Sequence, residues 1–529
     1  MKFDLTRDSF APLKRFSRVL SQQGRVQLDA DWNEQVDILL STVRTLAADI
    51  IGPHGSPDAG FTVEPLATAS PTPGDLRILP GRYYVDGILC ALADSRIPVT
   101  AFNTGNGKKV SVAAWTLDGV SFLIGQYVEL VDSASTPNTI VAAITGLDYA
   151  NLALTLDTDV SSLAANAPVT LHRLTTYLSQ PGLTSPAALP TGRVQLYLDV
   201  WERLVTWVED DSIREVALNG PDTTARAQVV WQVKATTASP NGGCLEPADL
   251  AALFQPAYRG LMRARTRPNP ANTNPCTVSP DSSYTGPENQ CYRVEVHIGS
   301  NDAAQRPPSF KWSRENGSVV FPVVSLKTGD GTTTVVVQDL GRDERFGIAE
   351  GDIVEVQDDA LVLADLPGPL LSVQAIDPSS LTVTLAGDVS DSTGSDPTLH
   401  PLLRRWDQTD QTDAPLGQDN AVAIPTSGDA WLALEDGIEV AFTTGGAPAY
   451  RTGDYWLIPA RVVTGDVIWP TETVTDAQNV TSTNPVAMPP GGVRHHYAPL
   501  ALATVNGKAA PIIKPLCGKV FSPLTAPAT

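Results

Sequence analysis

The sequence is poor in the features that would mark an enzyme, a secreted protein or a membrane protein. Only 18% of its 529 residues are charged, against about 25% in an average soluble domain. No apolar run in the sequence approaches the roughly 20 residues that a membrane-spanning helix needs. The first residues carry charges where a signal peptide has its apolar segment. We therefore expect synthesis in the cytoplasm without a signal peptide and no direct membrane insertion.

Cysteine is also scarce, and the five that occur form no CxxC pair: Cys90, Cys244, Cys276, Cys291 and Cys517. An odd number of widely spaced cysteines predicts buried, reduced thiols, as in a protein made in the cytosol. A disulfide between Cys276 and Cys291, across a segment rich in Pro, Ser and Asn, is the alternative.

Basic residues are fewer than acidic ones, because the sequence has 37 Lys and Arg and 58 Asp and Glu, which gives a net charge of −21. Phosphate binding needs clustered Lys and Arg, so the balance argues against a nucleic-acid partner and against an anionic membrane surface. One local exception is a basic patch near the N-terminus: Lys14, Arg15, Arg18 and Arg25. These residues are either solvated or capping side chains, or a docking arm for an acidic neighbour.

One helix is evident, and it follows the basic patch. Apolar residues recur at steps of three and four, which places them on one helical face: Leu28, Trp32, Val36, Leu39, Val43, Leu46 and Ile50. Asp29 and Asp31 stand near its start, where carboxylates favour the positive end of the helix dipole. Gly52-Pro53 ends it, because proline cannot continue the hydrogen-bond ladder.

Beyond residue 55 the pattern is that of a mainly β protein. Short runs rich in Val, Ile, Thr, Tyr and Trp alternate with Gly, Pro, Asn and Asp, as along residues 194–201 and 292–298. The proline-rich stretch 240–290 predicts a long surface excursion with one short helix near Pro247–Phe254.

A set of five short motifs occurs twice in the same order, first within residues 98–173 and again within 322–401. They include Gly-x-x-Val-Glu, which ends at Glu129 and Glu355, and a final Leu-His at His172 and His400. Such a repeat indicates duplication of one module. Each copy has about five short strands with a glycine-containing hairpin, which predicts a small closed barrel or sandwich.

The predicted fold class is therefore mainly β and multi-domain, with an N-terminal helix and two duplicated small β-barrel or sandwich modules on a larger β scaffold. We place the docking arm and helix at 1–55, the two modules at 98–173 and 322–401, the central scaffold at 56–97 and 174–321, and a C-terminal β unit at 402–529.

The adjacent pair His495 and His496 is the obvious metal candidate, but its spacing argues against a shared metal ion. His495 and His496 are adjacent, so in a strand their side chains point to opposite faces and cannot bind one ion without a bulge. No HExxH or CxxC supplies further ligands. His172 and His400 occupy equivalent positions in the repeat, which favours a structural role.

Acidic runs offer no cation site of a known spacing. Asp407, Asp410 and Asp413 stand at steps of three, whereas a Ca²⁺ loop of the EF-hand kind needs ligands at steps of two and a glycine. A polar loop or helix cap is the better interpretation. Two further runs predict solvated turns: Glu209-Asp210-Asp211 and Asp358-Asp359. We expect neither a metal nor a cofactor.

Motifs for catalysis are absent as well. The sequence has no Gly-x-Ser-x-Gly elbow, no phosphate-binding Gly-Lys-Ser/Thr and no GxGxxG. A pair of glycosidase carboxylates leaves no sequence motif, because its spacing is set only by the fold, so this alternative stays open. We expect the protein not to be an enzyme, with no catalytic and no cofactor-binding residues.

Several blocks along most of the chain resemble a known family. They are residues 4–10 (DLTRDSF), 16–35 (FSRVLSQQGRVQLDADWNEQ), 197–201, 213–218, 220–223, 288–295, 310–317 (FKWSRENG) and 494–497. These blocks are similar to a bacterial family of unknown function that is encoded beside phage-tail-like contractile injection systems. The same opening heads some proteins with unrelated C-terminal modules, so it resembles an attachment tag.

The resemblance implies a structural component of a contractile particle, near the baseplate or spike, with other particle subunits as partners and a homo-oligomeric ring as its form. Its mature location would be within the assembled particle, which is cytoplasmic, membrane-anchored or released. We expect docking through the N-terminal segment, with these residues: Arg7, Phe10, Arg18, Gln22, Arg25, Asp29, Asp31 and Trp32. The alternative is a glycan-binding or glycan-cleaving tail-associated protein, with these stacking candidates: Trp201, Trp207, Trp406 and Trp456.

Overall fold

The computed structural model describes residues 1–68, 72–102, 107–163, 168–218, 220, 222–255, 260–268, 283–390, 392–425, 430–443, 450–475, 481–507 and 510–522. Cys276, the repeat residues 104–106 and the part of the proline-rich excursion at 269–282 lie outside the described residues. The chain divides into two compact units. Unit 1 comprises Met1–Ser41, Glu202–Gln228 and Pro256–Arg494, and unit 2 comprises Thr42–Trp201, Val229–Gln255 and His495–Thr529.

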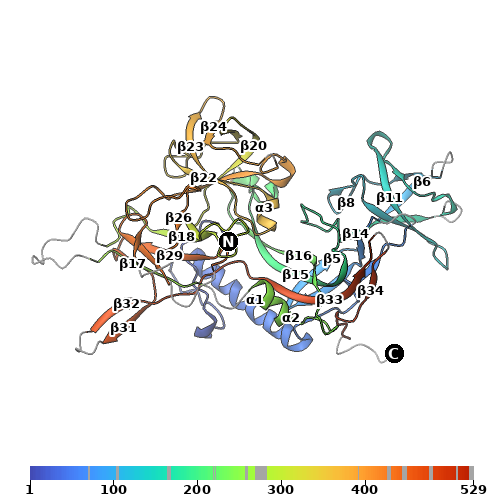
Figure 1. Ribbon diagram of the computed structural model, residues 1–529, viewed down its shortest axis with the longest axis horizontal. Coiled ribbons are helices and arrows are strands. Elements are labelled where there is room, and N and C mark those ends of the chain that lie inside the picture. Colours follow the sequence, from blue (N-terminus) through green and yellow to red (C-terminus); the bar gives the residue numbers. More distant parts are fainter. Residues whose placement is uncertain are drawn as a thin grey trace, which may run out of the picture. The chain divides into compact units, whose positions relative to one another are not determined.

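The second copy of the repeat forms a closed six-stranded barrel in unit 1, drawn in yellow to orange in Figure 1. Its strands are β20 (Val320–Gly329), β21 (Thr332–Val337), β22 (Ile353–Gln357), β23 (Leu370–Asp377), β24 (Thr382–Ala386) and β25 (Leu402–Trp406). Val335, Val354, Val383 and Leu403 fill its centre and are fully buried. β-branched residues at alternate positions suit such a pleated, half-buried surface.

The first copy forms a closed six-stranded barrel in unit 2. Its strands are β6 (Arg96–Phe102), β7 (Lys109–Val112), β10 (Tyr127–Asp132), β11 (Thr139–Asp148), β12 (Ala153–Leu156) and β13 (Val169–Arg173). Around the first barrel the order is β10-β11-β12-β7-β6-β13, and around the second it is β22-β23-β24-β21-β20-β25. Corresponding strands therefore take the same places, as duplication requires.

Unit 1 also holds the sheet that carries the candidate site. Its order is β26-β19-β18-β29-β30, and all its pairings are antiparallel. The strands are β18 (Gln290–Ile298), β19 (Ser309–Ser313), β26 (Val422–Ala423), β29 (Tyr455–Arg461) and β30 (Asp466–Val467). Every residue of β18 and of β19 is buried. Apolar and polar side chains nevertheless alternate along both strands, so one sheet face packs against an apolar core and the other buries charge.

The remaining elements of unit 1 are short. A three-stranded sheet contains β17 (Met262–Thr266), β27 (Leu432–Ala433) and β28 (Ile438–Phe442), and a two-stranded ribbon contains β31 (Thr471–Thr475) and β32 (Thr481–Pro485). The helical pieces are α3 (Asp359–Leu363), η1 (Pro12–Lys14), η4 (Asp211–Ile213), η5 (Val216–Leu218) and η6 (Pro397–Leu399).

Unit 2 adds four small sheets to its barrel. The first sheet contains β16 (Arg226–Thr237), β15 (Gly192–Val205), β33 (His496–Val505) and β34 (Ile512–Lys514), and the second contains β1 (His54–Gly55), β4 (Gly81–Val85) and β5 (Ile88–Leu92). The third contains β14 (Thr175–Thr176), β3 (Leu76–Ile78) and β2 (Val63–Pro65), and the fourth contains β8 (Thr116–Leu117) and β9 (Val120–Ser121). The helical pieces are α2 (Pro247–Phe254), η2 (Tyr149–Asn151) and η3 (Ser161–Leu163).

The long N-terminal helix is α1 (Asp29–Ile51), and it contributes residues to both units. It ends immediately before Gly52-Pro53, as the sequence predicts. Among the described residues, no helix combines the length and the apolar character that crossing a bilayer needs. The predicted fold class is confirmed: a mainly β chain with an N-terminal helix and two closed six-stranded barrels among further sheets.

The cysteines differ from the sequence prediction. Cys244 and Cys517 form a disulfide within unit 2, whereas Cys90 and Cys291 are free and buried. The prediction of reduced thiols throughout is therefore wrong, and Cys291 is not bridged to Cys276. Sequence spacing gave no sign of the pair that does form, because 273 positions separate its members and only the fold brings them together.

Candidate functional site

The charged face of the β18–β19 sheet holds a buried ion network in unit 1. Lys311 on β19 places its Nζ 2.6 Å from Glu355 Oε2 and 3.5 Å from Glu295 Oε1. Lys2 places its Nζ 2.9 Å from the same Glu295 oxygen. The exposed fraction of the Lys311 side chain is only 2%. These four side chains join the N-terminal segment, the sheet and strand β22 of the second barrel.

The pairing offsets the cost of burying Glu355. Burial raises the pKa of this carboxyl, but the charges of Lys311 and Lys2 outweigh it and hold the pKa at about 2. Two neutral donors complete its coordination, because Trp406 Nε1 donates at 2.8 Å and the Gly368 amide at 3.0 Å. The carboxylate is thus fully satisfied and serves as an anchor for the barrel.

The first barrel uses the equivalent residue of the repeat in the same manner. Glu129 on β10 ends the same Gly-x-x-Val-Glu motif as Glu355 on β22. It accepts two hydrogen bonds from the Arg77 guanidinium of β3, at 2.9 and 3.1 Å. In both copies the motif therefore supplies a buried carboxylate that binds a cation on a neighbouring sheet, which the sequence alone does not reveal.

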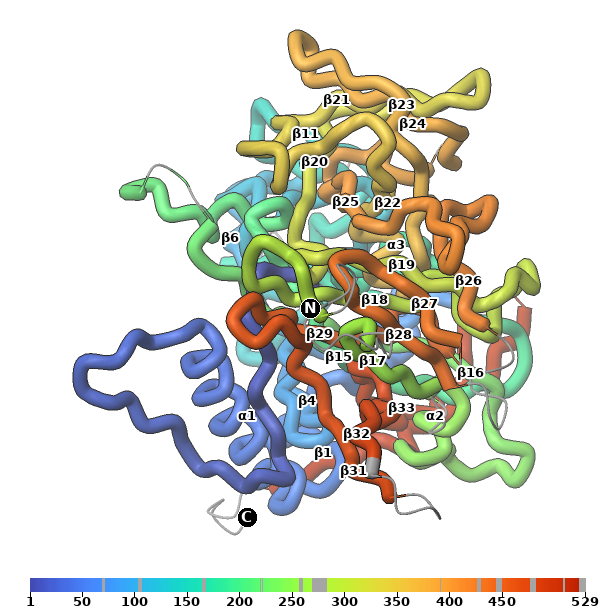
Figure 2. Tube along the Cα trace, turned by 90° about the vertical axis from the view of Figure 1, so that its left-hand side faces the viewer, coloured from blue at the N-terminus to red at the C-terminus, as the bar shows by residue number. Residues whose placement is uncertain are grey.

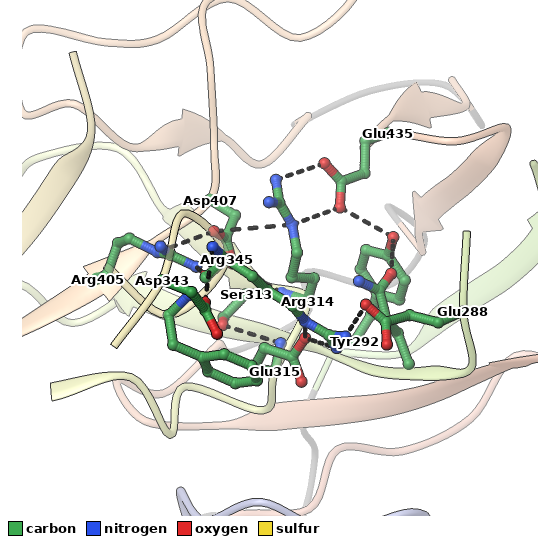
Figure 3. Close-up of polar contacts among 12 residues, drawn as sticks. Glu288, Tyr292, Ser313, Arg314, Glu315, Asp343, Arg345, Arg405, Asp407 and Glu435 are labelled. Carbon is green, nitrogen blue, oxygen red and sulfur yellow. Dashed lines mark hydrogen bonds and ion pairs between the residues drawn. The ribbon is translucent and has the colours of Figure 1, made fainter. Parts of the chain in front are cut away.

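A second charged cluster lies at the turn that follows β19 (Figure 3). The Arg314 guanidinium binds both carboxylate oxygens of Glu435, with Nε–Oε1 at 2.9 Å and Nη2–Oε2 at 2.7 Å. The Tyr292 hydroxyl donates to the same Glu435 Oε1 at 2.9 Å. Arg345, from the segment between β21 and β22, donates through Nε to Glu315 Oε1 at 2.8 Å and also contacts Glu288.

The carboxylates of this second cluster are paired with arginines. Each of the carboxylates Glu288, Glu315, Asp407 and Glu435 contacts an arginine. Burial, reinforced by the carboxylates of Asp4 and Asp407, raises the pKa of Glu315 to about 7. A glycosidase needs two carboxylates that face one substrate, one as acid and one as base or nucleophile. In Figure 3 the carboxylates of Glu288, Glu315, Asp407 and Glu435 instead face guanidinium groups.

The same turn fixes the start of the chain. Asn316 has a positive φ of 52°, and its Nδ2 donates to the carbonyls of Phe3 at 2.7 Å and Met1 at 3.2 Å. Arg461 Nη2 donates to the Thr6 carbonyl at 2.9 Å. Residues 1–6 therefore lie against unit 1 through specific backbone contacts.

The arm, which we define as residues 11–28, leaves from this anchored start and forms a wide loop beside α1 (Figure 2). Contacts hold its base and one point along it. Thr6 donates through its amide and hydroxyl to Asp29, at 2.8 and 2.7 Å, and Ser9 Oγ donates to Glu34 at 2.7 Å. The Val19 amide donates to Gln35 Oε1 at 2.8 Å. The arm is thus tied to polar residues of α1.

The apolar side of α1 is exposed, and this side is the one that the sequence pattern defines. Trp32 is 71% exposed, while Ala30 and Ile38 on the other side are 1% and 4% exposed. We call the exposed set the α1 face, and its members are Trp32, Val36, Leu39, Leu40, Val43, Leu46 and Ile50. Apolar residues of the arm are also exposed: Leu13, Phe16, Leu20 and Val26.

The eight predicted docking residues are placed as follows. Arg18, Gln22 and Arg25 on the arm, with Asp29 and Trp32 on the helix, are exposed, whereas Arg7, Phe10 and Asp31 are half-buried. The carboxylates of two of them accept hydrogen bonds within the chain, because Asp29 accepts from the Thr6 amide and Asp31 Oδ2 accepts from the Leu28 amide at 3.3 Å. Those two carboxylates organise the start of α1, while the other exposed residues remain available on the surface.

The histidines that the sequence suggested as metal ligands have carboxylate partners within the chain. His495 Nδ1 lies 2.7 Å from Asp199 Oδ1, and His496 Nδ1 lies 2.7 Å from Asp86 Oδ2, so the two rings diverge. Among the described residues there is no group of three or more His, Cys, Asp or Glu side chains that could hold a metal ion. His400 Nδ1 lies 2.9 Å from Asp359 Oδ2, next to the second barrel.

The proposed stacking residues are occupied within the chain. Trp201, Trp406 and Trp456 are buried. The Arg214 guanidinium lies 3.8 Å above the ring of Trp207. The three buried rings are thus not on the surface, and one face of the Trp207 ring is covered by Arg214.

The fold and the site define a mainly β protein with a duplicated barrel, internal ion networks and an exposed N-terminal helix face. Residues 1–107, 185–246 and 244–526 match the model of the family of unknown function DUF6519, and the chain belongs to this family. The predicted membership in a family of unknown function is thereby confirmed. No curated protein and no solved structure matches the chain significantly.

Proposed function

We propose that the chain is a non-enzymatic structural component of a phage-tail-like contractile injection particle, at its baseplate or spike end, attached through its N-terminal segment. One observation carries the proposal. The arm is anchored at its base by Thr6 and Ser9 and exposes large apolar side chains, such as Leu13 at 95%. Several exposed large apolar side chains on one short segment favour a protein interaction site.

Charge on the arm favours an acidic neighbour. Its four basic residues, Lys14, Arg15, Arg18 and Arg25, are exposed, and they belong to a chain of net charge −21. A basic segment on an acidic protein attracts an acidic surface and resists approach in other orientations. Attachment in one orientation is what a subunit of an ordered particle needs.

The ion networks support the non-enzymatic part of the proposal. Lys311, Glu355 and Glu295 connect the barrel to the sheet, and Arg345 with Glu315 connects the segment between β21 and β22 to the turn after β19. Such fixed pairs hold a rigid scaffold in place and are satisfied without a substrate.

The experiment is co-purification with the particle in the producing bacterium. We expect Leu13→Ser combined with Phe16→Ser and Leu20→Ser to lower recovery of the chain in sedimented particles at least tenfold, because the arm loses its apolar contacts. Arg18→Glu combined with Arg25→Glu should lower it in a salt-dependent manner. Val463→Ser is the matched control, since Val463 is 96% exposed elsewhere in unit 1. If both arm variants are incorporated into particles as well as the wild type, with unchanged circular dichroism, the proposal is refuted.

A further inference from the structure

The α1 face follows a seven-residue repeat. From Trp32 onward the exposed apolar residues are separated by 4, 3, 4, 3 and 4 positions: Trp32, Val36, Leu39, Val43, Leu46 and Ile50. Spacings that alternate between three and four place side chains at heptad positions a and d, which form the seam of a coiled coil. Val36, Val43 and Ile50 then occupy a, and Trp32, Leu39 and Leu46 occupy d.

The residue types at these positions point to a particular partner geometry. From Val36 onward the a positions hold β-branched side chains, and two of the three d positions hold leucine; the first a position of α1 is Asp29, whose carboxylate accepts from Thr6. β-branched residues at a with leucine at d favour a parallel pair of helices, because each side chain then packs well into the hole on the facing helix. In the described part of the chain this seam is exposed.

We infer that a second copy of this chain covers the α1 face, and that two α1 helices pair as a parallel, in-register, two-stranded coiled coil. The inference goes beyond the proposed function, because pairing occurs without the particle and uses the helix instead of the arm.

The residues that flank the seam are compatible with a pair of identical helices. In a parallel pair each g position meets an e position of the partner. Gln35 therefore meets Leu40, and Thr42 meets Ala47, so these contacts bring no like charges together. The uncharged flanks let two copies associate although each carries a net charge of −21. A different acidic or basic protein would find no complementary charge along these flanks.

The area is sufficient for a stable pair. The exposed parts of the seven side chains of the α1 face amount to about 600 Å² per helix, or about 1,200 Å² for a pair, which reaches the range of specific interfaces. The helix is already formed and is held by the Thr6 and Ser9 contacts at its start. Association therefore does not carry the entropic cost of folding the helix.

The first test is the oligomeric state of the purified full chain, measured by light scattering coupled to size exclusion. We expect a mass of two chains for the wild type, and of one chain for Leu39→Asp combined with Leu46→Asp, with at least a tenfold rise in the dissociation constant. Val216→Asp combined with Val463→Asp is the matched control, since these residues are 85% and 96% exposed elsewhere, and it should remain a dimer. A wild type with the mass of one chain overturns the inference, as does a dimer that survives both α1 substitutions.

The second test measures the direction of the pair through a disulfide. Leu39→Cys should crosslink two copies under mild oxidation, because position d faces its own equivalent in a parallel pair. Thr45→Cys is exposed on the same helix but lies away from the seam, and it should not crosslink. An antiparallel arrangement, seen as crosslinking of neither variant in a wild-type dimer, would contradict the in-register geometry.

The particle assay separates this inference from the proposed function. The variant carrying Leu39→Asp and Leu46→Asp should lose self-association, whereas the arm variants should lose incorporation into particles and remain dimers. Circular dichroism and the thermal midpoint confirm that each variant is folded.

Discussion

Removing the buried cation Lys311 should reveal how strongly the second barrel is held to the sheet. Lys311→Met keeps the length of the side chain and deletes its charge. Glu355 would then keep the neutral donors Trp406 and Gly368, while Glu295 would stay paired with Lys2 and Arg293. Loss of one partner from a buried ion pair costs about 3–5 kcal/mol, because the remaining charge stays buried without compensation.

The pKa of Glu355 gives an independent magnitude. Its folded-state pKa of about 2 lies below the ordinary value of 4.5, and the difference corresponds to about 3 kcal/mol. Because the folded pKa is depressed, this stability is present above pH 4.5 and is lost as the pH falls towards 2. In Lys311→Met the carboxyl protonates more easily, so the difference between variant and wild type should shrink from pH 7 to pH 5.

The assay is urea unfolding followed by tryptophan fluorescence, since Trp406 donates directly to Glu355. Lys327→Met is the matched control, because Lys327 is exposed on β20 of the same barrel, and it should change the free energy of unfolding by less than about 0.5 kcal/mol. Lys311→Met combined with Glu355→Gln should recover part of the loss, since no charge is then stranded. A loss below about 1 kcal/mol, or one that is equal at pH 7 and pH 5, would refute the reasoning.

Three further predictions concern single positions. Gly87→Ala should destabilise unit 2 by about 1–3 kcal/mol in thermal unfolding, because a Cβ there overlaps the α1 backbone at a φ of 76°; Gly119→Ala, with the same φ but open space, should cost less. Burial raises the pKa of Glu315 to about 7, so the contribution of this carboxyl to folding stability is fully present below pH 4.5 and is lost as the pH rises through 7. Glu315→Gln should therefore flatten the dependence of the thermal midpoint on pH between 5 and 8. An unchanged pH profile would contradict this prediction. Breaking the disulfide by Cys244→Ser should lower the stability of unit 2 by about 2–5 kcal/mol, and a reductant should lower the wild type equally while leaving the variant unaffected.

The two barrels could be predicted because their signals are local. Short β-branched runs and glycine-containing turns lie within each copy of about 80 residues, and the same order of motifs occurs in both copies. The ion pairs of Glu129 and Glu355 could not be predicted from these local signals. Each is conspicuous in the repeat, but their partners Arg77 and Lys311 come from separate sheets. Ion pairs between distant segments follow from the assembled fold and leave no spacing in the sequence.

The α1 helix shows where periodicity stops being informative. The pattern from Trp32 to Ile50 specifies one apolar face, but a face that is buried and a face that awaits a partner have the same period. The deciding facts are that Ala30 and Ile38 are buried on the other side of the helix, whereas the apolar face is exposed among the described residues. With that side packed against the chain, the exposed face is available to a partner, and β-branched residues at a with leucine at d favour a second α1 over an irregular surface.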